Sequence, residues 1–374
     1  MKINFFFTPL PSDMEQYVES STISLSLYTE QAPNWKDADI VLMSIPDYRE
    51  LKEGEYTDDL NVIRRHFYSL NTPWKGKKIV DLGDLKPGPS KEDTYLRIKE
   101  VVSHLLQENC IPIILGGSHD LSYGQYLAYV ENEQLVHMAN ASPTIDLFFD
   151  NSRDKKSLLG EIILHEPNHL FGYTHLAHQS FLTAEEDLSL MDQFGFESIR
   201  IGDLKDNIKE VEPYIRMGDF LAFDIQAIRA SDSPCSTSPF GFSAEEACQT
   251  AWYAGQNNQM SSIGLYQYRS DTDHNERSAQ IYATMLWYFI DGYYHRKGEG
   301  KLTDKHYLKF TVTLEKADIV FFKDNLSDKW WLEIGTPIHA KSNRKTLLAC
   351  NYADYEEAIS GKIPERWLNA QIKN

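Results

Sequence analysis

A recurring pattern of short apolar segments, separated by helix-length stretches, constrains this chain more than any other feature of its sequence. Several of the segments end in glycine or aspartate. Buried strands that alternate with helices form a mostly parallel sheet with helices on both faces. We therefore predict a three-layer α/β/α fold around a mostly parallel central sheet. The predicted strands are residues 38–46, 78–84, 111–117, 134–139, 198–202, 218–224 and 260–266.

The stretches between these strands have the spacing of helices. Residues 93–107 carry apolar side chains at intervals that fall on one helix face, and residues 279–294 are long, apolar and aromatic. Ser243 is followed three residues later by Glu246, a pairing that predicts a capping box at the start of another helix.

Both ends of the chain also have strand-like runs. Residues 1–7 form a short apolar run that we interpret as a first or edge strand. We treat residues 1–374 as a single domain. Residues 298–374 change in character, with strand-like runs at 307–314 and 317–322, and are predicted to be a strand-rich C-terminal extension packed on the sheet edge.

The composition argues against several classes of partner. The formal net charge is -18, from 37 Lys+Arg against 55 Asp+Glu, whereas binding to nucleic acid or to an anionic membrane surface requires basic patches. Four scattered cysteines without metal-binding spacing predict buried free thiols. The sequence has neither a signal-peptide pattern nor a long apolar run, so we expect a cytoplasmic location.

Two strand ends carry side chains suited to chemistry, and ligands of parallel sheets bind beyond the carboxyl ends of the strands. His119 follows Gly116 and Gly117 at the end of one predicted strand, where an imidazole can bind a metal ion. An ordinary strand-to-helix turn with a hydrogen-bonded histidine is the alternative. Asp224 ends another strand, and Gln226 lies on the same face two residues later.

Taken in order, three strand ends resemble the metal-binding motifs of the ureohydrolase family, which contains arginases, agmatinases and formiminoglutamases. Residues 116–119 match a Gly-Gly-Asp-His motif, residues 140–144 an Asp-Ala-His-x-Asp motif, and residues 224–226 with 232–234 a third motif that ends in Asp-Pro. The similarity covers roughly residues 35–295 and is greatest to a divergent formiminoglutamase-like branch. It implies an arginase-like fold, in which six side chains hold two Mn²⁺ ions that activate a hydroxide for attack on an amidine carbon.

The departures from these motifs matter more than the matches. By the resemblance, His119 and Asp224 keep their ligand positions, while four other ligands are replaced by neutral residues. A further position, where relatives carry a glutamate that receives the cationic group of the substrate, holds a glutamine. Neutral side chains cannot offset the repulsion between two divalent cations, so we expect one Mn²⁺ ion or none. The degenerate positions are Asn140, Ser142, Thr144, Gln226 and Gln267.

A remodelled site for one ion is the alternative. Asp146 follows Thr144 by two residues and would share its strand face, so that it could join His119 and Asp224. Asp120 and His137 are further candidates, although a histidine inside a strand is more often a satisfied core residue.

A second group of histidines falls between residues 165 and 178. A metal-binding tract is one interpretation. The irregular spacing and the absence of cysteine favour loop and helix surface. The four residues are His165, His169, His175 and His178.

Three functional hypotheses follow. The first is a catalytically impaired ureohydrolase relative, or pseudoenzyme, that binds a small amidine-like ligand or a protein. The second is an active hydrolase of a C–N bond in a linear amidine, with a remodelled single-metal site. The third is a structural subunit, since the resemblance implies a homo-oligomer. Fold analogy alone does not decide among them.

Overall fold

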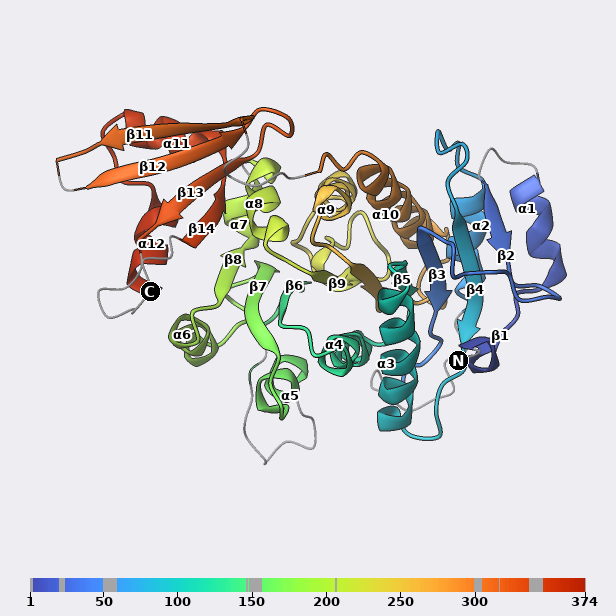
Figure 1. The fold of residues 1–374 in the computed structure, drawn as a ribbon. Coiled ribbons are helices and arrows are strands. Elements are labelled where there is room, and N and C mark those ends of the chain that lie inside the picture. Colours follow the sequence, from blue (N-terminus) through green and yellow to red (C-terminus); the bar gives the residue numbers. More distant parts are fainter. Residues whose placement is uncertain are drawn as a thin grey trace.

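The computed structural model describes residues 3–19, 24–49, 59–145, 147, 157–205, 207–298, 305–315, 317–335 and 346–373. Within these ranges the chain forms a large central sheet flanked by helices, followed by a smaller sheet near the C-terminus (Figure 1). No helix in this part of the chain is long and apolar enough to cross a membrane.

The central sheet confirms the predicted fold class. Its strands follow the order β1-β4-β3-β5-β10-β9-β6-β7-β8, with β2 also paired to β4. All of the pairings are parallel except that of β1 with β4. The strands are β1 (Phe7–Thr8), β2 (Leu25–Leu27), β3 (Ile40–Ser44), β4 (Ile79–Leu85), β5 (Ile111–Leu115), β6 (Val136–Ala141), β7 (Leu170–His178), β8 (Glu197–Arg200), β9 (Phe220–Asp224) and β10 (Ser262–Tyr266).

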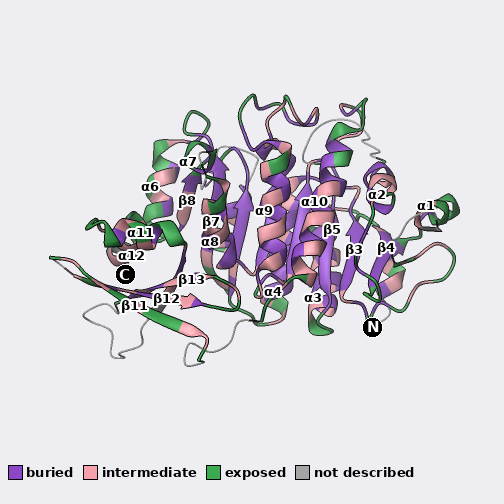
Figure 2. Cartoon of the chain, turned by 90° about the horizontal axis from the view of Figure 1, so that it is seen from above, coloured by how far each residue is buried: buried purple, intermediate pink, exposed green. Residues whose placement is uncertain are grey.

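Helices cover both faces of this sheet, and each face has its own hydrophobic core. The sheet lies between the two layers, with its strands buried (Figure 2). One face packs against α2 (Asn61–Tyr68), α7 (Ile201–Lys205), α8 (Val211–Arg216), α9 (Ala244–Gln256) and α10 (Arg277–Tyr294). The other packs against α3 (Lys91–Gln107), α4 (Ser122–Glu131), α5 (Leu158–Leu164) and α6 (Glu185–Gln193). The short helix α1 (Glu15–Glu19) lies near the N-terminus.

The predicted helix start at Ser243 is confirmed in atomic detail. The Ser243 hydroxyl accepts a hydrogen bond from the Glu246 backbone N–H at 3.2 Å, and the Glu246 carboxylate accepts one from the Ser243 N–H at 2.7 Å. This capping box satisfies two backbone donors that a helix start would otherwise leave unpaired. It fixes where α9 begins, directly after the loop that follows β9.

Two sequence-based predictions differ from the structure. Residues 3–6 form a 3-10 turn, and only Phe7–Thr8 pairs as an edge strand. The region of clustered histidines was predicted to be loop and helix surface, but it contains strand β7. His175 and His178 are buried there, so that part of the prediction was wrong. The strand was missed because Thr174, His175 and His178 interrupt its apolar run.

The C-terminal residues form a four-stranded antiparallel sheet with a core of its own. The strands are β11 (Tyr307–Thr313), β12 (Asp318–Asp324), β13 (Trp330–Ile334) and β14 (Thr346–Cys350), followed by α11 (Tyr352–Ile359) and α12 (Glu365–Lys373). Trp330 is buried and its neighbour Trp331 half-buried, as expected for successive residues of a strand. The prediction that residues 298–374 extend a single domain stays a prediction.

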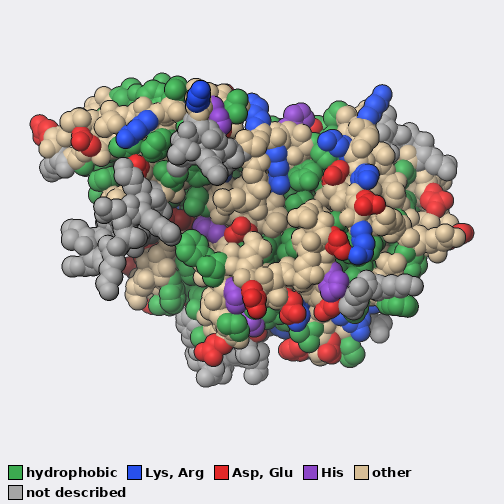
Figure 3. All heavy atoms as spheres, viewed as in Figure 1, with side chains coloured by type: hydrophobic (Ala, Val, Ile, Leu, Met, Phe, Trp, Pro, Cys, Tyr) green, Lys and Arg blue, Asp and Glu red, His purple; other side chains and the backbone are tan. Residues whose placement is uncertain are grey.

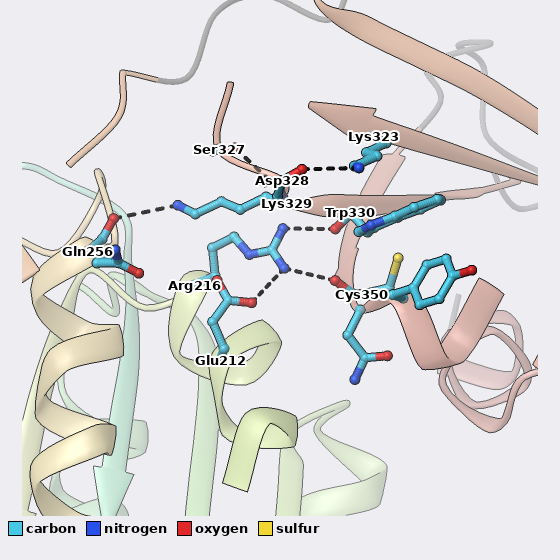
Figure 4. Close-up of a pocket in the computed structure, with 11 residues that line it drawn as sticks. Glu212, Arg216, Gln256, Lys323, Ser327, Asp328, Lys329, Trp330 and Cys350 are labelled. Atoms are coloured by element: carbon cyan, nitrogen blue, oxygen red, sulfur yellow. Dashed lines mark hydrogen bonds and ion pairs between the residues drawn. The ribbon is translucent and has the colours of Figure 1, made fainter. Parts of the chain in front are cut away.

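One arginine joins the C-terminal sheet to the central body of the protein (Figure 4). Arg216, at the end of α8, is 3% exposed. It donates hydrogen bonds to the carbonyls of Trp330 and Cys350, both at 2.8 Å, and to the Glu212 carboxylate at 2.7 Å. Its guanidinium also lies over the Trp331 ring, 4.6 Å from the centroid.

The cysteines fit the compositional analysis. On the face shown in Figure 3, acidic and basic side chains are interspersed. All four cysteines are free and buried, as predicted. Burial raises the pKa of the Cys110 thiol to about 11 and that of Cys248 to about 12, which keeps both protonated at neutral pH.

The substitution Arg216→Ala tests the junction between the two sheets. It should lower the free energy of unfolding by about 2–5 kcal/mol, because each buried acceptor left without a donor costs about 1–3 kcal/mol. Urea unfolding followed by tryptophan fluorescence measures the change. Arg200→Ala, at a side chain that is 55% exposed, is the matched control and should change stability by less than about 0.5 kcal/mol. Equal effects of the two substitutions would contradict this role for Arg216.

Candidate metal centre at the carboxyl ends of the strands

Four neighbouring strands bring the candidate residues together. In the sheet, β5, β10, β9 and β6 lie next to one another in that order. His119 follows β5, Gln267 follows β10, Asp224 ends β9, and Asn140 is the fifth residue of β6. Because these strands are parallel, their carboxyl ends meet at one edge of the sheet.

A glycine turn after β5 makes room for His119. Gly117 has φ +74°, and a Cβ there would lie 2.8 Å from the Ile45 carbonyl oxygen and 2.2 Å from the Leu121 side chain. A larger residue would therefore face both a strained backbone and a clash. The Gly117 carbonyl accepts a hydrogen bond from the Gln267 N–H at 2.8 Å, which ties the ends of β5 and β10 together.

The side chains at this edge form a connected polar network. His119 Nε2 lies 2.8 Å from Asn140 Oδ1, and His119 Nδ1 lies 3.8 Å from Asp224 Oδ2. Gln267 donates from Nε2 to Asp224 Oδ2 at 3.2 Å, and the Gln226 N–H donates to Asp224 Oδ1 at 2.8 Å. The two side chains with the strongest ligand chemistry, His119 and Asp224, are therefore adjacent; Asp224 is buried, and the His119 side chain is 13% exposed.

The network continues from Asn140 into strand β7. Asn140 Nδ2 donates to the Tyr173 hydroxyl at 3.0 Å, and that hydroxyl lies 3.0 Å from His175 Nδ1. His175 Nε2 lies 2.9 Å from the Ser142 carbonyl oxygen. A chain of hydrogen bonds thus runs from the imidazole of His119 to a backbone carbonyl two residues beyond Asn140.

The backbone carbonyl at the end of this chain sets the direction of donation. It can only accept, so His175 Nε2 carries a proton and, in the neutral ring, His175 Nδ1 accepts from the Tyr173 hydroxyl. The Tyr173 oxygen in turn accepts from the Asn140 amide. Asn140 Oδ1 is then left to accept from His119 Nε2–H, and the lone pair of a neutral His119 is on Nδ1, the nitrogen nearer Asp224.

Burial governs the protonation of these groups. Burial lowers the pKa of His119, and the nearby Asp224 carboxylate partly offsets this shift. Burial raises the pKa of Asp224, and the nearby His119 partly offsets that shift. Burial lowers the pKa of His175 to about 3. The imidazole of His175 is therefore neutral at physiological pH, as the directed chain of hydrogen bonds requires.

Among the remaining degenerate positions, Gln226 directs its amide away from His119 and Asp224. Gln226 donates from its amide to the Cys235 carbonyl at 2.8 Å and accepts from the Thr237 N–H at 2.9 Å, so its side chain belongs to the following loop. Ser142 is buried, and its carbonyl serves as the acceptor at the end of the network. Thr144 is exposed.

Of the further candidates for a remodelled site, Asp120 and His137 have other hydrogen-bond partners. Asp146 lies outside the described residues. Asp120 accepts a hydrogen bond from the Tyr95 hydroxyl. His137 is the second residue of β6, about 10 Å before Asn140 at the rise of a strand, and its ring Nε2 lies 2.8 Å from the Thr174 hydroxyl.

Two Mn²⁺ ions do not fit this donor set. Among the described family positions, His119 Nδ1 and the Asp224 carboxylate are the two strong ligands, and no group of three or more His, Cys, Asp or Glu side chains that could hold a metal ion occurs in the described part of the chain. Two divalent cations close together require several carboxylates. The amide oxygen of Asn140 instead accepts a hydrogen bond from His119.

Two residues of the network, Tyr173 and His175, were not identified from the sequence. They alternate along β7 and so share one face of the strand. That spacing was the available signal, but it is informative only once residues 170–178 are assigned to a strand. His165 and His169 do not belong to the network, since their rings contact the Tyr123 hydroxyl and the Pro167 carbonyl.

Comparison with known protein sequences identifies relatives. The model of the arginase family matches residues 59–291. Formimidoylglutamase from Geobacillus thermodenitrificans is 24% identical over 188 residues, which cover 46% of this chain and 58% of the relative's length. Formimidoylglutamase from Lysinibacillus sphaericus is 20% identical over 247 residues, which cover 61% of this chain and 75% of the relative.

Solved structures show the same fold. Trypanosoma cruzi formiminoglutamase, solved with Mn²⁺, matches with a TM-score of 0.63 at 17% identity, over 71% of this chain and 97% of that one. Formimidoylglutamase from Bacillus subtilis matches with a TM-score of 0.60 at 15% identity, over 76% of this chain and 99% of that one. At such identities the likeness establishes the fold of the central body.

The substitution Tyr173→Phe tests the polar network. It removes a buried hydroxyl that connects Asn140 with His175, and should destabilise the protein by about 1–3 kcal/mol because two buried polar groups lose their partner. Thermal and urea unfolding measure the loss. Tyr123→Phe removes the same group from a half-buried ring bonded to the half-buried His165 and should cost clearly less. Similar losses for both variants would argue against a buried, directed network.

The protonation of His175 predicts a dependence of stability on pH. Its pKa is about 3 in the folded protein, against an ordinary value of 6.5 that applies once the chain unfolds. Stability is therefore complete above pH 6.5 and falls as the pH drops, because only the unfolded state takes up the proton. At about pH 5 the loss is about 2 kcal/mol.

The variant His175→Gln does not titrate. Its unfolding free energy should therefore decrease by about 2 kcal/mol less than that of the wild type between about pH 7.5 and about pH 5. Parallel pH profiles would show that His175 is protonated in the folded state.

Proposed function

Because the chain belongs to the arginase family, we propose that it is a formiminoglutamase-like ureohydrolase relative whose site no longer holds two Mn²⁺ ions and no longer hydrolyses amidines. It then acts through binding or assembly. Its expected small amidine-like ligand, its homo-oligomeric state and its cytoplasmic location belong to the same proposal. The relatives named formimidoylglutamase suggest the ancestral substrate class, not the present activity.

The observation that carries this proposal is the hydrogen bond between His119 Nε2 and Asn140 Oδ1 at 2.8 Å. By the family resemblance, an aspartate ligand stands at position 140. The amide here is neutral and is engaged on both sides, by His119 and by the Tyr173 hydroxyl. At the described family positions, Asp224 alone supplies a full negative charge, which leaves the charge of two divalent cations largely uncompensated.

A single-metal hydrolase is the second candidate, and one distance favours it. His119 Nδ1 and Asp224 Oδ2 are 3.8 Å apart, and an ion that binds both at about 2.1 Å can span that separation. The lone pair on His119 Nδ1 faces the carboxylate, as such a site requires. The amide of Gln267 would compete with such an ion for Asp224, because it already donates a hydrogen bond to that carboxylate.

Turnover of N-formimino-L-glutamate, agmatine and arginine in the presence of Mn²⁺ distinguishes these candidates. The wild type should release no product above the rate without protein. If product does form and the substitution Asp224→Asn abolishes it, the single-metal hydrolase is correct and the first proposal fails. Product formation that survives Asp224→Asn would contradict both candidates.

Restoring the four lost ligands tests the assignment of the positions. The variant Asn140→Asp, Ser142→His, Thr144→Asp and Gln226→Asp should bind Mn²⁺ at least about 10-fold more tightly than the wild type, because it regains three carboxylates and an imidazole. Titration calorimetry measures the affinity. A variant with Gln249→Asp, Thr250→His, Thr284→Asp and Gln280→Asp, which introduces the same three aspartates and one histidine on α9 and α10 away from the strand ends, serves as the control. No gain over that control would show that the four positions do not converge as ligands.

A further inference from the structure

A second cavity lies away from the family site, where the central body meets the C-terminal sheet. It has a volume of about 340 Å³ and is lined by residues of β7, α8, β14 and α12. His137 also lines it, near the amino end of β6. The strand ends that carry His119 and Asp224 are at the other end of the sheet, although Tyr173, which lines this cavity, also belongs to the polar network of that site.

The walls of the cavity are largely apolar and aromatic. Phe171, Phe194, Tyr214, Met217 and Leu348 contribute to them. Phe171 is 77% exposed and Phe194 is 44% exposed, so two large rings are accessible beside the opening. Small-molecule sites combine apolar and aromatic walls with a few placed polar groups, and they occur preferentially where structural units meet.

The imidazole of His137 supplies such a polar group. Its backbone N–H donates to Asp219 Oδ2 at 2.7 Å, and its Nε2 lies 2.8 Å from the Thr174 hydroxyl. Its Nδ1 has no hydrogen-bond partner among the described residues. A Cβ at Gly172 would lie 2.4 Å from this nitrogen, so the imidazole packs directly on the Gly172 backbone and a glycine is needed at that position.

The charged side chains that line the cavity, Arg366 and Glu197, both have partners within the protein, which favours a neutral ligand. Burial lowers the pKa of His137 to about 4, which leaves the ring uncharged at physiological pH. Arg366 lines the cavity but pairs with Glu210 at 3.2 Å and with Asp354 at 3.3 Å, and its guanidinium lies 4.2 Å from the Tyr214 ring centroid. A charged ligand would have to displace these ion pairs.

We propose that this cavity binds a small, uncharged heteroaromatic molecule of bicyclic size, hydrogen-bonded to His137 Nδ1 and packed against the aromatic wall. The size follows from the volume, since an apolar cavity of about 150 Å³ holds benzene and this one is about twice as large. The class follows from the combination of flat apolar walls with one neutral hydrogen-bonding nitrogen.

Ligand-observed NMR titrations of the full chain with benzimidazole and with indene test the proposal. The two molecules have nearly the same shape, but indene lacks the nitrogens. Benzimidazole should bind saturably and about 3- to 10-fold more tightly than indene, the contribution of one neutral hydrogen bond. The substitution His137→Phe should remove that difference and leave indene binding unchanged. Lys323→Ala, in the neighbouring pocket of Figure 4, should alter neither.

Two further variants test the location by blocking the site. Gly172→Ala would place a methyl carbon 2.4 Å from Nδ1, which displaces the imidazole, so it should weaken benzimidazole binding more than indene binding. Met217→Trp fills the cavity and should abolish the binding of both. Far-UV circular dichroism and thermal unfolding identify any variant that fails to fold. The variants that do fold then show whether benzimidazole binds in this cavity. No saturable binding of benzimidazole to the wild type, or equal binding to the wild type and His137→Phe, would overturn the proposal. Neither result bears on metal binding at the strand ends.

Discussion

The imidazole of His119 lies between a carboxylate and an amide, and the amide governs what this edge of the sheet can hold. With an amide at position 140, His119 Nε2–H has a neutral acceptor at 2.8 Å. The same amide donates to Tyr173, whose hydroxyl lies 3.0 Å from His175. Each group in this series of hydrogen bonds has a neighbour as its partner, so the polar side chains at this edge of the sheet are stable without an ion. The positive charge of two metal ions would meet chiefly the carboxylate of Asp224.

The sequence predicted the parts of the fold that depend on local chemistry. Continuous apolar runs identified the central strands, and the capping pair at Ser243 identified the start of α9. The sequence also predicted that His119 and Asp224 would lie at strand ends, because glycine turns and terminal aspartates are local signals. Strand β7 was missed, since His175 and other polar residues interrupt its apolar pattern. Its polar face is buried against the network, and that depends on tertiary contacts that local periodicity does not encode.

The C-terminal sheet and its junction with the central body lie away from the strand ends that carry His119 and Asp224. Its antiparallel strands have their own core, and Arg216 connects them to α8 through two backbone carbonyls. Pairing a buried guanidinium with carbonyls and with the Glu212 carboxylate offsets its desolvation. Beside this junction, His137 lines a cavity whose walls come from both parts. The residues at the carboxyl ends of the strands thus explain the proposed loss of the metal site. The proposed second site lies at the junction between the central body and the C-terminal sheet.

The manganese content of the full-length protein tests the central claim most directly. The purified wild type is incubated with Mn²⁺, desalted and measured by elemental analysis. A neutral network around His119 and Asn140 predicts well under about one ion per chain. About two ions per chain would contradict the account and restore a binuclear hydrolase. About one tightly held ion would also contradict it, and would assign His119 and Asp224 to a single-metal site.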